Sequence, residues 1–477
     1  MLFSAYTFGC KLNQLETEAI SDSFCREGFD IIPALLKKTQ VSDPSVIVIN
    51  TCTVTSMAEQ KARRLIRKLL REQPLACLII TGCYAQMDSA ELLKLQEELH
   101  ASQLTPGRVF VIPGKKKDRI MDLPRFLAEA DEPEQLPHLI ASWVSSDLRS
   151  TDCKSEDCKH GDGSFRFKPE KFSSHSRGFL KIQDGCDRRC TFCRVSLARG
   201  QSRSLGAAEV LNELNALEER GFMEAVLTGV NIAQYRDSEM DLAGLLDFLL
   251  KGTEKIRLRL SSIEPDELND EFIQVLVSSR IQPHFHLSLQ SGSAEILEKM
   301  GRPGNPEKIE KTLKQLRSVR HDPFLACDII AGFPGESDEE FEKTYKFCQK
   351  NAFAWIHAFP FSPRPGTAAI NFSPKVPESD AVRRVNLLTA LAKKGRRDYL
   401  GRWLGKEVEA IVEGEGKNEK GKEKREMRGA VPGVSENYLK LLIDNGGSPV
   451  PAPGSLVKCR ILQPADEAFD AFAERVE

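Results

Sequence analysis

Six short apolar runs recur between residues 178 and 359, and segments with helical periodicity fill the gaps between them. The runs lie at residues 178–182, 224–227, 256–260, 284–289, 325–330 and 354–359. The clearest helical patterns lie at residues 208–220, 267–279 and 339–350. Six consecutive βα units predict an incomplete (βα)6 barrel related to the eightfold barrel, whose functional groups come from loops at the carboxyl ends of the strands.

Three thiols lie in the loop after the first of these runs, at Cys186, Cys190 and Cys193. Three residues separate the first pair and two separate the second, so one loop can fold them around a single centre. No fourth cysteine follows nearby, whereas a structural zinc site needs four protein ligands. Three ligands leave a coordination position open, which favours a catalytic centre. A zinc finger is the alternative, but no Cys or His pair follows at finger spacing.

The other loops at the predicted carboxyl ends carry polar residues and glycines. They lie at residues 228–231, 261–265, 290–293, 332–336 and 362–364. One such loop alone is weak evidence, because glycine-rich turns are common in βα units. Six of them at one end of the barrel indicate a functional site.

The first 140 residues predict a second α/β region. Apolar runs at residues 2–7, 45–50, 76–81 and 109–112 alternate with helical patterns, which is typical of an open parallel, Rossmann-like sheet. Cys10, Cys52 and Cys83 each follow one of the first three runs. Ligand sites in such sheets lie beyond the carboxyl ends of the strands. From the residues alone, a second three-thiol site and three unrelated cysteines remain equally open.

Composition limits the class of protein. The chain has 477 residues, enough for about three domains, with 41% hydrophobic and 29% charged residues and a net charge of -2. No basic leader and no uninterrupted run of about 18 apolar residues is present, so we expect a cytoplasmic protein with no membrane segment. Cytoplasmic thiols stay reduced, and the 13 cysteines therefore favour ligands or core residues over disulfides.

The pattern changes mark the expected domain limits. We expect an N-terminal domain at 1–140, a linker at 141–174, the barrel at 175–400 and a C-terminal domain at 401–477. Cys153, Cys158 and His160 lie in the linker, where incidental residues are a better interpretation than a metal site. Short apolar runs at 408–412, 438–443 and 456–461 predict a small antiparallel barrel, followed by an acidic tail at 466–477.

Two basic segments could contact a polyanion. On a helix, Lys61, Arg64, Lys68 and Arg71 form one outer stripe. Residues 417–428 contain six Lys or Arg against three Glu, a local charge of +3. Both are candidates for RNA phosphate contacts. A solvated helix face and a charged hairpin are the alternatives.

Among the eight histidines, only His284 and His286 have the spacing of a possible metal pair. Two positions apart on a strand, their side chains share a face. No third ligand is evident beside them, so packed histidines are the better interpretation.

The cysteine loop on such a barrel resembles the radical S-adenosylmethionine (SAM) superfamily. The resemblance implies that Cys186, Cys190 and Cys193 bind a 4Fe-4S cluster, whose open iron is chelated by SAM. It also implies SAM contacts from the barrel loops and from the arginine after the cysteine loop. These candidates are Thr228, Gly229, Asn231, Ser262, Glu264, Gln290 and Arg199. For Arg199, a helix cap or a surface ion pair is an equal alternative.

Motifs along nearly the whole chain resemble the methylthiotransferase family within that superfamily. They lie at residues 7–14, 50–55, 81–86, 227–231, 289–293 and 361–364. The resemblance implies a second 4Fe-4S cluster on Cys10, Cys52 and Cys83, and a C-terminal TRAM domain. The Gly-Cys-Lys-x-Asn-Gln sequence around Cys10 is most similar to the MtaB branch. One departure is Ser196, where the family usually has proline.

This branch implies methylthiolation of C2 of N6-threonylcarbamoyladenosine at position 37 of tRNA. The implied partners are the anticodon loops of ANN-decoding tRNAs and a reductant such as flavodoxin or ferredoxin, whereas the sulfur donor stays unknown. The alternatives are the isopentenyladenosine tRNA branch, the ribosomal-protein branch, and a non-catalytic RNA-binding protein that holds a metal.

Overall fold

The computed structural model describes residues 1–32, 43–94, 108–130, 132–146, 163–172, 175–302, 305–414, 430–465 and 468–476. Cys153, Cys158, His160 and the basic segment 417–428 lie outside these ranges. The chain forms two compact units. The first comprises Met1–Ser173, Asp184–Arg188 and Cys193–Gln201, and the second comprises Ser174–Gln183, Arg189–Phe192 and Ser202–Glu477.

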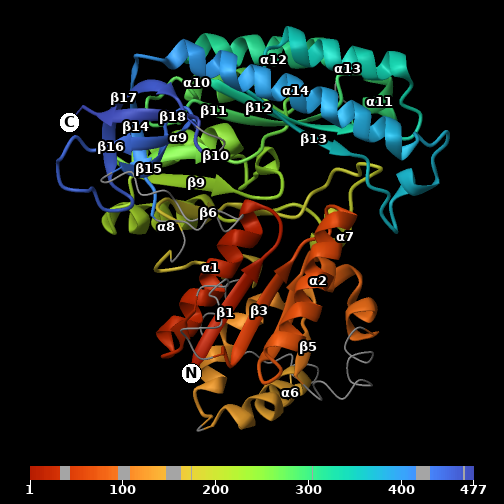
Figure 1. Cartoon of the computed structure of the whole chain (residues 1–477), viewed down its shortest axis with the longest axis vertical. Coiled ribbons are helices and arrows are strands. Elements are labelled where there is room, and N and C mark those ends of the chain that lie inside the picture. Colours follow the sequence, from red (N-terminus) through yellow and green to blue (C-terminus); the bar gives the residue numbers. More distant parts are fainter. Residues whose placement is uncertain are drawn as a thin grey trace. The chain divides into compact units, whose positions relative to one another are not determined.

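The first unit contains a five-stranded parallel sheet with strand order β2-β1-β3-β4-β5 (Figure 1). Its strands are β1 (Leu2–Thr7), β2 (Asp30–Ile31), β3 (Val46–Thr51), β4 (Cys77–Gly82) and β5 (Val109–Val111). Four of the five were predicted, and the prediction of an open parallel sheet is confirmed. The two-residue β2 is too short to give a periodic signal.

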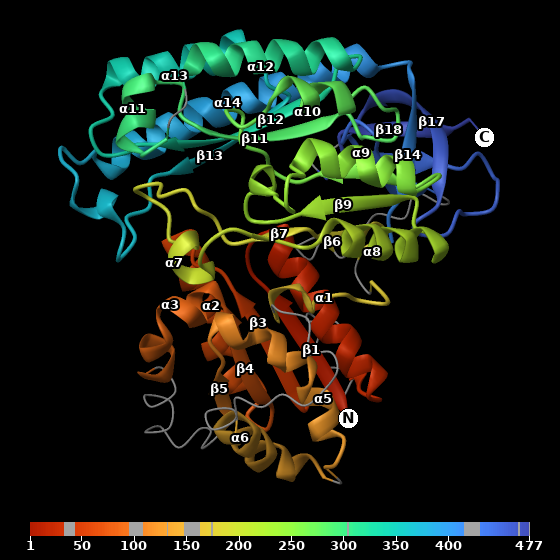
Figure 2. The same cartoon turned by 180° about the vertical axis from the view of Figure 1, so that it is seen from behind.

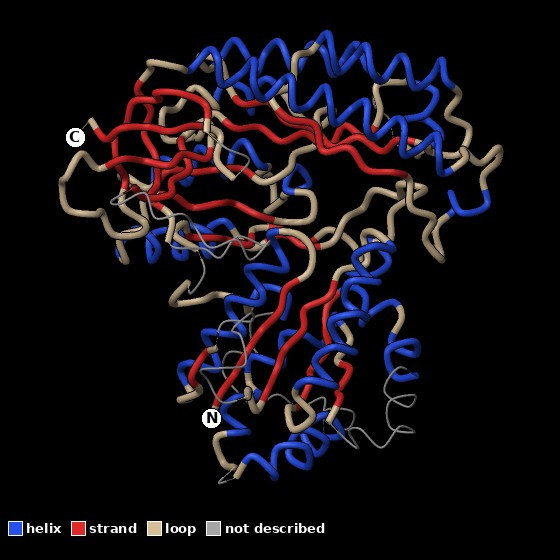
Figure 3. The backbone as a smooth tube through the Cα atoms, in the orientation of Figure 1, coloured by secondary structure: helices blue, strands red, loops and turns tan. Residues whose placement is uncertain are grey.

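Helices cover both faces of this sheet, as the tube in Figure 3 shows for α1 and α2. The side chains of β3 alternate between two cores: Val46 and Val48 pack with α1, while Ile47 and Ile49 pack with α2. A strand that is buried on both faces needs such a continuous apolar run. The helices are α1 (Lys11–Arg26), α2 (Ser56–Glu72), α3 (Cys83–Met87), η1 (Gly114–Met121), α5 (Leu123–Leu127), η2 (Pro133–Gln135), α6 (Leu136–Ser146), η4 (Gly163–Phe165) and α7 (Val195–Arg199).

The core of the first unit extends beyond residue 140. Helix α6 runs through that position, and its Leu139 and Trp143 pack on the same core as α1. Phe167 is buried there as well. The domain limits expected at residues 140 and 174 remain predictions.

The second unit contains the six predicted barrel strands. They are β6 (Gly178–Lys181), β9 (Glu224–Thr228), β10 (Arg257–Leu260), β11 (His284–Gln290), β12 (Phe324–Ala331) and β13 (Trp355–Pro360). Two parallel three-stranded sheets form, with orders β10-β9-β6 and β11-β12-β13, and single bridges join Leu258 to Ile281 and Ile263 to Leu287 (Figure 2). The incomplete barrel is therefore confirmed.

Helices follow the barrel strands. They are α8 (Ala207–Glu219), η5 (Ile232–Gln234), α9 (Leu242–Gly252), α10 (Asp270–Val275), α11 (Ala294–Lys299), α12 (Pro306–Val319), α13 (Asp338–Lys350), η6 (Ala368–Asn371) and α14 (Glu378–Trp403). Side-chain caps begin five of them: Asp241, Asn269, Ser293, Asn305 and Ser337 each accept a backbone N–H of the first turn. The short strands β7 (Gln183–Asp184) and β8 (Arg203–Ser204) flank the cysteine loop and α7 in sequence.

A closed five-stranded barrel ends the chain, with order β14-β15-β16-β18-β17. The strands are β14 (Glu407–Val412), β15 (Ala430–Ser435), β16 (Lys440–Asp444), β17 (Leu456–Pro464) and β18 (Ala471–Arg475). Its pairs are antiparallel except for β16 with β18. The acidic tail expected at 466–477 contains a strand that was not predicted, β18, whose Ala471 and Ala473 are buried in the barrel.

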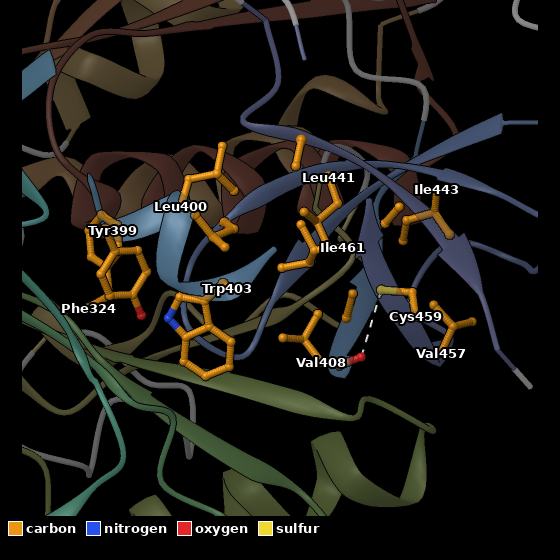
Figure 4. Packing of buried hydrophobic residues seen from close by; sticks show 14 of the residues in the cluster. Phe324, Tyr399, Leu400, Trp403, Val408, Leu441, Ile443, Val457, Cys459 and Ile461 are labelled. Carbon is orange, nitrogen blue, oxygen red and sulfur yellow. Dashed lines mark hydrogen bonds between the residues drawn. The ribbon is translucent and has the colours of Figure 1, made fainter. Parts of the chain in front are cut away.

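One hydrophobic core joins this small barrel to the (βα)6 barrel (Figure 4). Phe324 of β12 and Trp403 at the end of α14 belong to the same cluster as Val408 and Ile461. The Cys459 thiol lies inside and donates to the Val408 carbonyl at 3.7 Å, so this cysteine is a core residue. In the described ranges, the helices are all too short or too polar to cross a membrane.

Candidate functional site

Three cysteines follow the carboxyl ends of adjacent strands in the first unit. Cys10 comes after β1 and directly before α1, Cys52 follows β3, and Cys83 follows β4 and begins α3. The register pairs Thr7 with Asn50 and Thr51 with Gly82, so the three strands end at one edge. We call this edge, with Cys10, Cys52 and Cys83, the three-thiol end.

Asn13 forms hydrogen bonds to the backbone before Cys10 and before Cys52. Its Nδ2 donates to the carbonyl of Phe8 at 2.8 Å and to that of Thr51 at 3.2 Å. Asn50 Nδ2 returns a hydrogen bond to the Asn13 carbonyl at 3.1 Å. A single amide of α1 thus fixes the backbone just before Cys10 and just before Cys52.

The backbone at the three-thiol end approaches closely. A Cβ on Gly9 would lie 2.8 Å from Cys52 Cβ and 2.9 Å from its Sγ, so the Cys10 loop rests directly against Cys52. Gly82 has φ +100° and ψ -167°, a region that only glycine enters readily. This glycine turns the chain from β4 into Cys83.

Burial raises the pKa of two of these thiols, Cys10 and Cys52. Burial, with a smaller contribution from the neighbouring Cys10 and Cys83, raises the pKa of Cys52 to about 12. The pKa of Cys10 is also raised, first by the protein atoms around its sulfur, although the residue keeps exposed surface. Arg199 opposes both shifts. A metal must therefore displace these protons when it binds.

Two buried cations lie near the three-thiol end. Lys117 of η1 pairs with Glu16 of α1 and donates to Asn50 Oδ1 at 3.4 Å. Burial lowers the pKa of Lys117, and Glu16 opposes this shift. Arg199 contacts Glu16 and Asp184 at 3.0 Å. Buried cations beside three thiols favour an anionic occupant such as a thiolate-bound cluster.

The donor chemistry of these residues, three thiols, fits an iron–sulfur cluster. Within the described ranges, no group of three or more His, Cys, Asp or Glu side chains is close enough to hold one ion. The thiolates on a cluster bind different iron atoms, so their sulfurs stand farther apart than the ligands of one ion. Three thiols on neighbouring strand ends are donors of the kind that such a cluster takes.

The loop cysteines are divided between the units. Cys186 and Cys193 belong to the first unit, where Cys186 N–H donates to the Gly200 carbonyl at 3.1 Å. Cys193 Sγ accepts the Val195 N–H at 3.4 Å. Ser196 stands where the family usually has proline. Its backbone carbonyl accepts the Gly200 N–H at 2.9 Å, so serine forms a regular helical turn in α7.

Cys190 belongs to the second unit, where Arg302 fixes it. Arg302 Nη1 lies 3.7 Å from Cys190 Sγ, and its Nη2 donates to the Ser288 carbonyl at 2.6 Å. The same guanidinium pairs with Glu264, a predicted SAM contact. Thr191 adds hydrogen bonds to the carbonyls of Lys299 and Met300, both at 2.9 Å.

The predicted SAM contacts of the second unit lie at or just after the carboxyl ends of β9, β10 and β11. Gln183 Oε1 accepts the N–H groups of Val230 and Asn231, at 2.9 and 2.8 Å, and thereby shapes the loop of Thr228 and Gly229. Asn231 is buried, and its Oδ1 has no hydrogen-bond partner. An orphaned buried acceptor suits a ligand that carries donors.

Ser262 and Gln290 complete this set. Ser262 Oγ lies 3.0 Å from His286 Nδ1, and His286 Nε2 lies 3.1 Å from Asp328 Oδ1. His284 instead stacks on Tyr438, with ring centroids 3.9 Å apart, so the two histidines have separate partners. Gln290 has φ +72° beside a register shift in β11, and such strain is common at functional positions.

The remaining candidate, Arg199, lies in the first unit. Its guanidinium contacts Glu16, Asp184 and Asn13 Oδ1, at 2.9 to 3.2 Å. Contact of Arg199 with SAM stays a prediction, as do the other SAM contacts and the cluster ligands.

Sequence reasoning missed three residues at these sites: Arg194, Lys117 and Arg302. Each is a buried cation, with 3 to 7% of its surface exposed. Only Arg194 stood beside a motif, directly after Cys193. Lys117 and Arg302 lie far from the cysteines they approach, and periodicity gives no signal for a buried cation in a loop or 3-10 helix.

Two family models and several curated relatives match this chain. Residues 180–348 match the radical SAM superfamily, and residues 3–102 match the uncharacterized protein family UPF0004. A threonylcarbamoyladenosine tRNA methylthiotransferase MtaB of Treponema pallidum is 38% identical over 494 residues, covering 95% of this chain and 97% of the relative. The MtaB of Bacillus subtilis is 32% identical, covering 96% and 93%.

A relative of a different name is less similar. The tRNA-2-methylthio-N(6)-dimethylallyladenosine synthase of Bacillus subtilis is 28% identical, covering 98% of this chain and 85% of the relative. The similarity to MtaB proteins is above 30% and extends over both units. This chain belongs to the MtaB family of radical SAM tRNA methylthiotransferases.

Proposed function

We propose that this enzyme replaces the C2 hydrogen of N6-threonylcarbamoyladenosine at position 37 of tRNA with a methylthio group. The observation that carries the proposal is the 38% identity, over 95% of the chain, to a relative named for this nucleoside. Identity to the dimethylallyladenosine relative is 28%. The substrate would be the anticodon loop of ANN-decoding tRNAs.

Two sets of cysteines support a division of labour. In the proposal, Cys186, Cys190 and Cys193 hold one 4Fe-4S cluster and the three-thiol end holds a second. When bound, the first cluster supplies the electron for SAM cleavage and the second supplies the methylthio sulfur. An unactivated aromatic C–H bond resists acid–base chemistry, which explains the need for a radical cofactor. A reductant such as flavodoxin or ferredoxin would deliver electrons, and the sulfur donor stays open.

The residues around Cys190 would hold SAM in place. In the proposal, Asn231 Oδ1 accepts a hydrogen bond from SAM, and Thr228, Gly229, Ser262 and Gln290 line the same strand ends. Arg302 would fix Cys190 and orient Glu264 at the same time, because one guanidinium contacts both. Held groups of this kind reduce the cost of reorganisation when SAM reacts.

Helix α2 offers a surface for the tRNA backbone. Lys61, Arg64 and Lys68 are exposed on it, together with Arg67 and Arg71. Lys68 has one long ion pair with Glu72, at 3.9 Å. Val54 and Met57 are 58% and 60% exposed just after Cys52. Exposed cations next to exposed apolar side chains suit phosphates with an unstacked base nearby.

Charge reversal tests this surface. We expect the double variant Arg64→Glu/Lys68→Glu to bind tRNA about tenfold more weakly and to reduce the slope of log Kd against log salt by about 1 per lost phosphate contact. Lys346→Glu is a matched control, because Lys346 is exposed on α13 of the other unit. Equal binding by the double variant and the control would exclude α2 from the interface.

Mass spectrometry of tRNA nucleosides tests the proposed reaction. We expect a strain without this gene to lose methylthio-threonylcarbamoyladenosine, to accumulate the unmodified nucleoside, and to recover when the wild-type gene returns. A variant with Cys186, Cys190 and Cys193 replaced by Ala should fail to restore it. Unchanged levels of the methylthio nucleoside would contradict the proposal.

The same samples separate the alternatives. Loss of methylthio-dimethylallyladenosine would indicate the isopentenyladenosine branch, and loss of a methylthio group from a ribosomal protein would indicate that branch. Anaerobically purified protein should contain iron and sulfide. Zinc without iron after reconstitution would favour a non-catalytic RNA-binding protein.

A further inference from the structure

Helix α7, directly after Cys193, is fastened to the first unit by two buried arginines. Arg194 and Arg199 stand at its two ends, and segment 193–201 lies wholly within that unit. The short helix packs against α3 and η1. The contacts of the two arginines reach every segment that carries a cysteine of the three-thiol end.

Arg194 contacts the chain after Cys52 and after Cys83. Its Nη1 and Nη2 donate to the two carboxylate oxygens of Asp88, at 2.9 and 3.1 Å, and Asp88 follows α3. The same Nη1 lies 3.2 Å from Thr53 Oγ1 and 3.4 Å from Glu59 Oε1. Thr53 Oγ1 in turn donates to Glu59 at 2.7 Å. Such a forked contact fixes orientation as well as distance.

Arg199 reaches the chain around Cys10 and before Cys52. Its two nitrogens bind both carboxylate oxygens of Glu16 on α1, at 3.0 and 3.2 Å. Nη2 also donates to Asn13 Oδ1 at 2.9 Å. Asn13 is the residue whose amide holds the carbonyls of Phe8 and Thr51. Arg199 is therefore one hydrogen bond away from the backbone of two cysteine loops.

Arg199 also fixes the entrance to the cysteine loop. It donates to Asp184 at 3.0 and 3.2 Å, and Asp184 precedes Cys186 by two residues. Asp184 in turn accepts the Gly185 N–H at 2.8 Å, and Cys186 N–H bonds to Gly200. The residues before Cys186 and after Cys193 are thus held by one guanidinium.

From these contacts we infer that Arg194 and Arg199 are positioning residues for sulfur transfer. They hold Cys186 and Cys193 in fixed register with Cys10, Cys52 and Cys83, so that a radical formed at one site meets sulfur held at the other. This inference rests on the proposed function. Neither arginine is a surface charge: Arg194, Glu16 and Asp184 expose 4% or less of their surface, and the Arg199 side chain exposes 9%. A buried ionic network costs desolvation, so its retention at this place suggests a specific role.

Conservative variants test the inference. Lysine keeps the charge but cannot donate two parallel hydrogen bonds to one carboxylate. Arg199→Lys and Arg194→Lys should therefore weaken the attachment of α7 to the first unit without removing a cation. We expect hydrogen–deuterium exchange of peptides covering 193–201 to rise in the cluster-free protein. In the reconstituted enzyme we expect Arg194→Lys, which replaces no candidate SAM contact, to form 5'-deoxyadenosine within about twofold of wild type. Methylthio product per 5'-deoxyadenosine should fall about tenfold, because a displacement of about 1 Å can cost 10²-fold.

Two further variants complete the experiment. Asp88→Asn removes the partner of Arg194 from a different element, which keeps the test open if the arginine variants do not fold. Arg26→Lys is the matched control, because Arg26 pairs with Asp22 and Glu170 in the same unit and is half exposed. The control should keep wild-type exchange and wild-type coupling.

The outcomes separate this inference from the proposed function. Faster hydrogen exchange of α7 together with reduced coupling, the amount of methylthio product per 5'-deoxyadenosine, supports the positioning role of the arginines. Unchanged exchange, or faster exchange with unchanged coupling, overturns it, and a raised KM for SAM with unchanged coupling would assign Arg199 to SAM binding instead. If the wild-type enzyme makes no methylthio nucleoside, the proposed function fails, whereas the exchange data still show whether the arginines fasten α7.

Discussion

The two cysteine sets are built in different ways. Cys186, Cys190 and Cys193 lie within eight residues, whereas 73 positions separate Cys10 from Cys83. The first set belongs to a single loop, but the second depends on the register of β1, β3 and β4. The loop set therefore depends on local turns and on side chains that anchor it, and the three-thiol end depends on the whole sheet.

This difference extends to the surrounding charges. Cys190 has Arg302 at 3.7 Å, held in turn by Glu264. The three-thiol end has Lys117 and Arg199 nearby, and both pair with Glu16. Each set thus has a buried cation that is oriented by a carboxylate. A local loop and a sheet edge can therefore reach similar electrostatic surroundings.

Removing one cysteine set at a time should have the largest effects. We expect replacement of Cys186, Cys190 and Cys193 by Ala to abolish SAM cleavage and to lower iron content by roughly half, because each set would carry its own cluster. Iron and sulfide assays with quantification of 5'-deoxyadenosine measure both.

The matching variant replaces Cys10, Cys52 and Cys83 by Ala. It should also lose roughly half of the iron, yet it should keep SAM cleavage and lose methylthio product by more than about 100-fold, since only the sulfur site is gone. If the first variant retained SAM cleavage, or the second retained product, the assigned division of labour would be wrong.

Glycine substitutions should separate the two kinds of support. A Cβ on Gly82 would lie 2.3 Å from the Thr51 carbonyl oxygen, and one on Gly185 would lie 1.9 Å from that of Gln201. Both have positive φ, so alanine is strained as well as crowded. We expect Gly82→Ala to lower the free energy of unfolding of the sheet by about 1–3 kcal/mol or more. Gly185→Ala should disturb the cysteine loop and leave the sheet intact.

Measurements of bound iron and of SAM cleavage check whether the two glycine substitutions affect different sites. Gly82→Ala should deplete iron bound at the three-thiol end while SAM cleavage continues, and Gly185→Ala should do the reverse. Gly401→Ala is the control: no atom lies within 4 Å of the added carbon, and alanine favours helix α14 by about 0.5–1 kcal/mol. Identical losses from both strained variants would mean that the two sites do not depend on separate supports.

The sequence predicted the parts of the fold that have strong periodicity. The six barrel strands and the four long strands of the first sheet follow from apolar runs, because buried parallel strands need them. The strands β2, β15 and β18 were missed because they are short or alternate with charged and proline residues. Pairing of β18 with β16 and β17 stabilises a segment whose composition resembles a solvated tail.

The sequence predicted the two cysteine sites to different extents. The loop cysteines are visible in the sequence from their spacing. Cys10, Cys52 and Cys83 could be suggested from the strand ends alone, and the family resemblance was needed to prefer a shared site. The contacts of Arg194 with Asp88, of Arg199 with Glu16 and of Arg302 with Glu264 could not be predicted, because each joins segments that are more than 35 positions apart.

The smallest expected effect is a difference in acid stability. Low pH should destabilise the strands that lead into the cysteine loop more than the strands of the three-thiol end. Strand β6 leads into the cysteine loop and pairs with β9, which begins at Glu224. Burial alone would raise the pKa of Glu224, but Arg259 at 2.6 Å and Arg177 at 3.6 Å outweigh it and lower this pKa below its ordinary value. A depressed pKa in the folded state adds stability above the unfolded value, near 4.3, and that stability is lost as the pH falls through the folded pKa.

Strands β3 and β4 contain no carboxylate, so their protection should change less with acid. Hydrogen exchange, corrected for its intrinsic pH dependence, should show a few-fold loss of protection in β9 and β10 below about pH 4, with a smaller loss in β3 and β4. Glu224→Gln should remove this pH dependence, and it should weaken β9 at neutral pH because Arg259 is left buried without its carboxylate. Equal loss in both sheets, or an unchanged acid response in Glu224→Gln, would show that this ion pair does not distinguish the support of the cysteine loop from that of the three-thiol end.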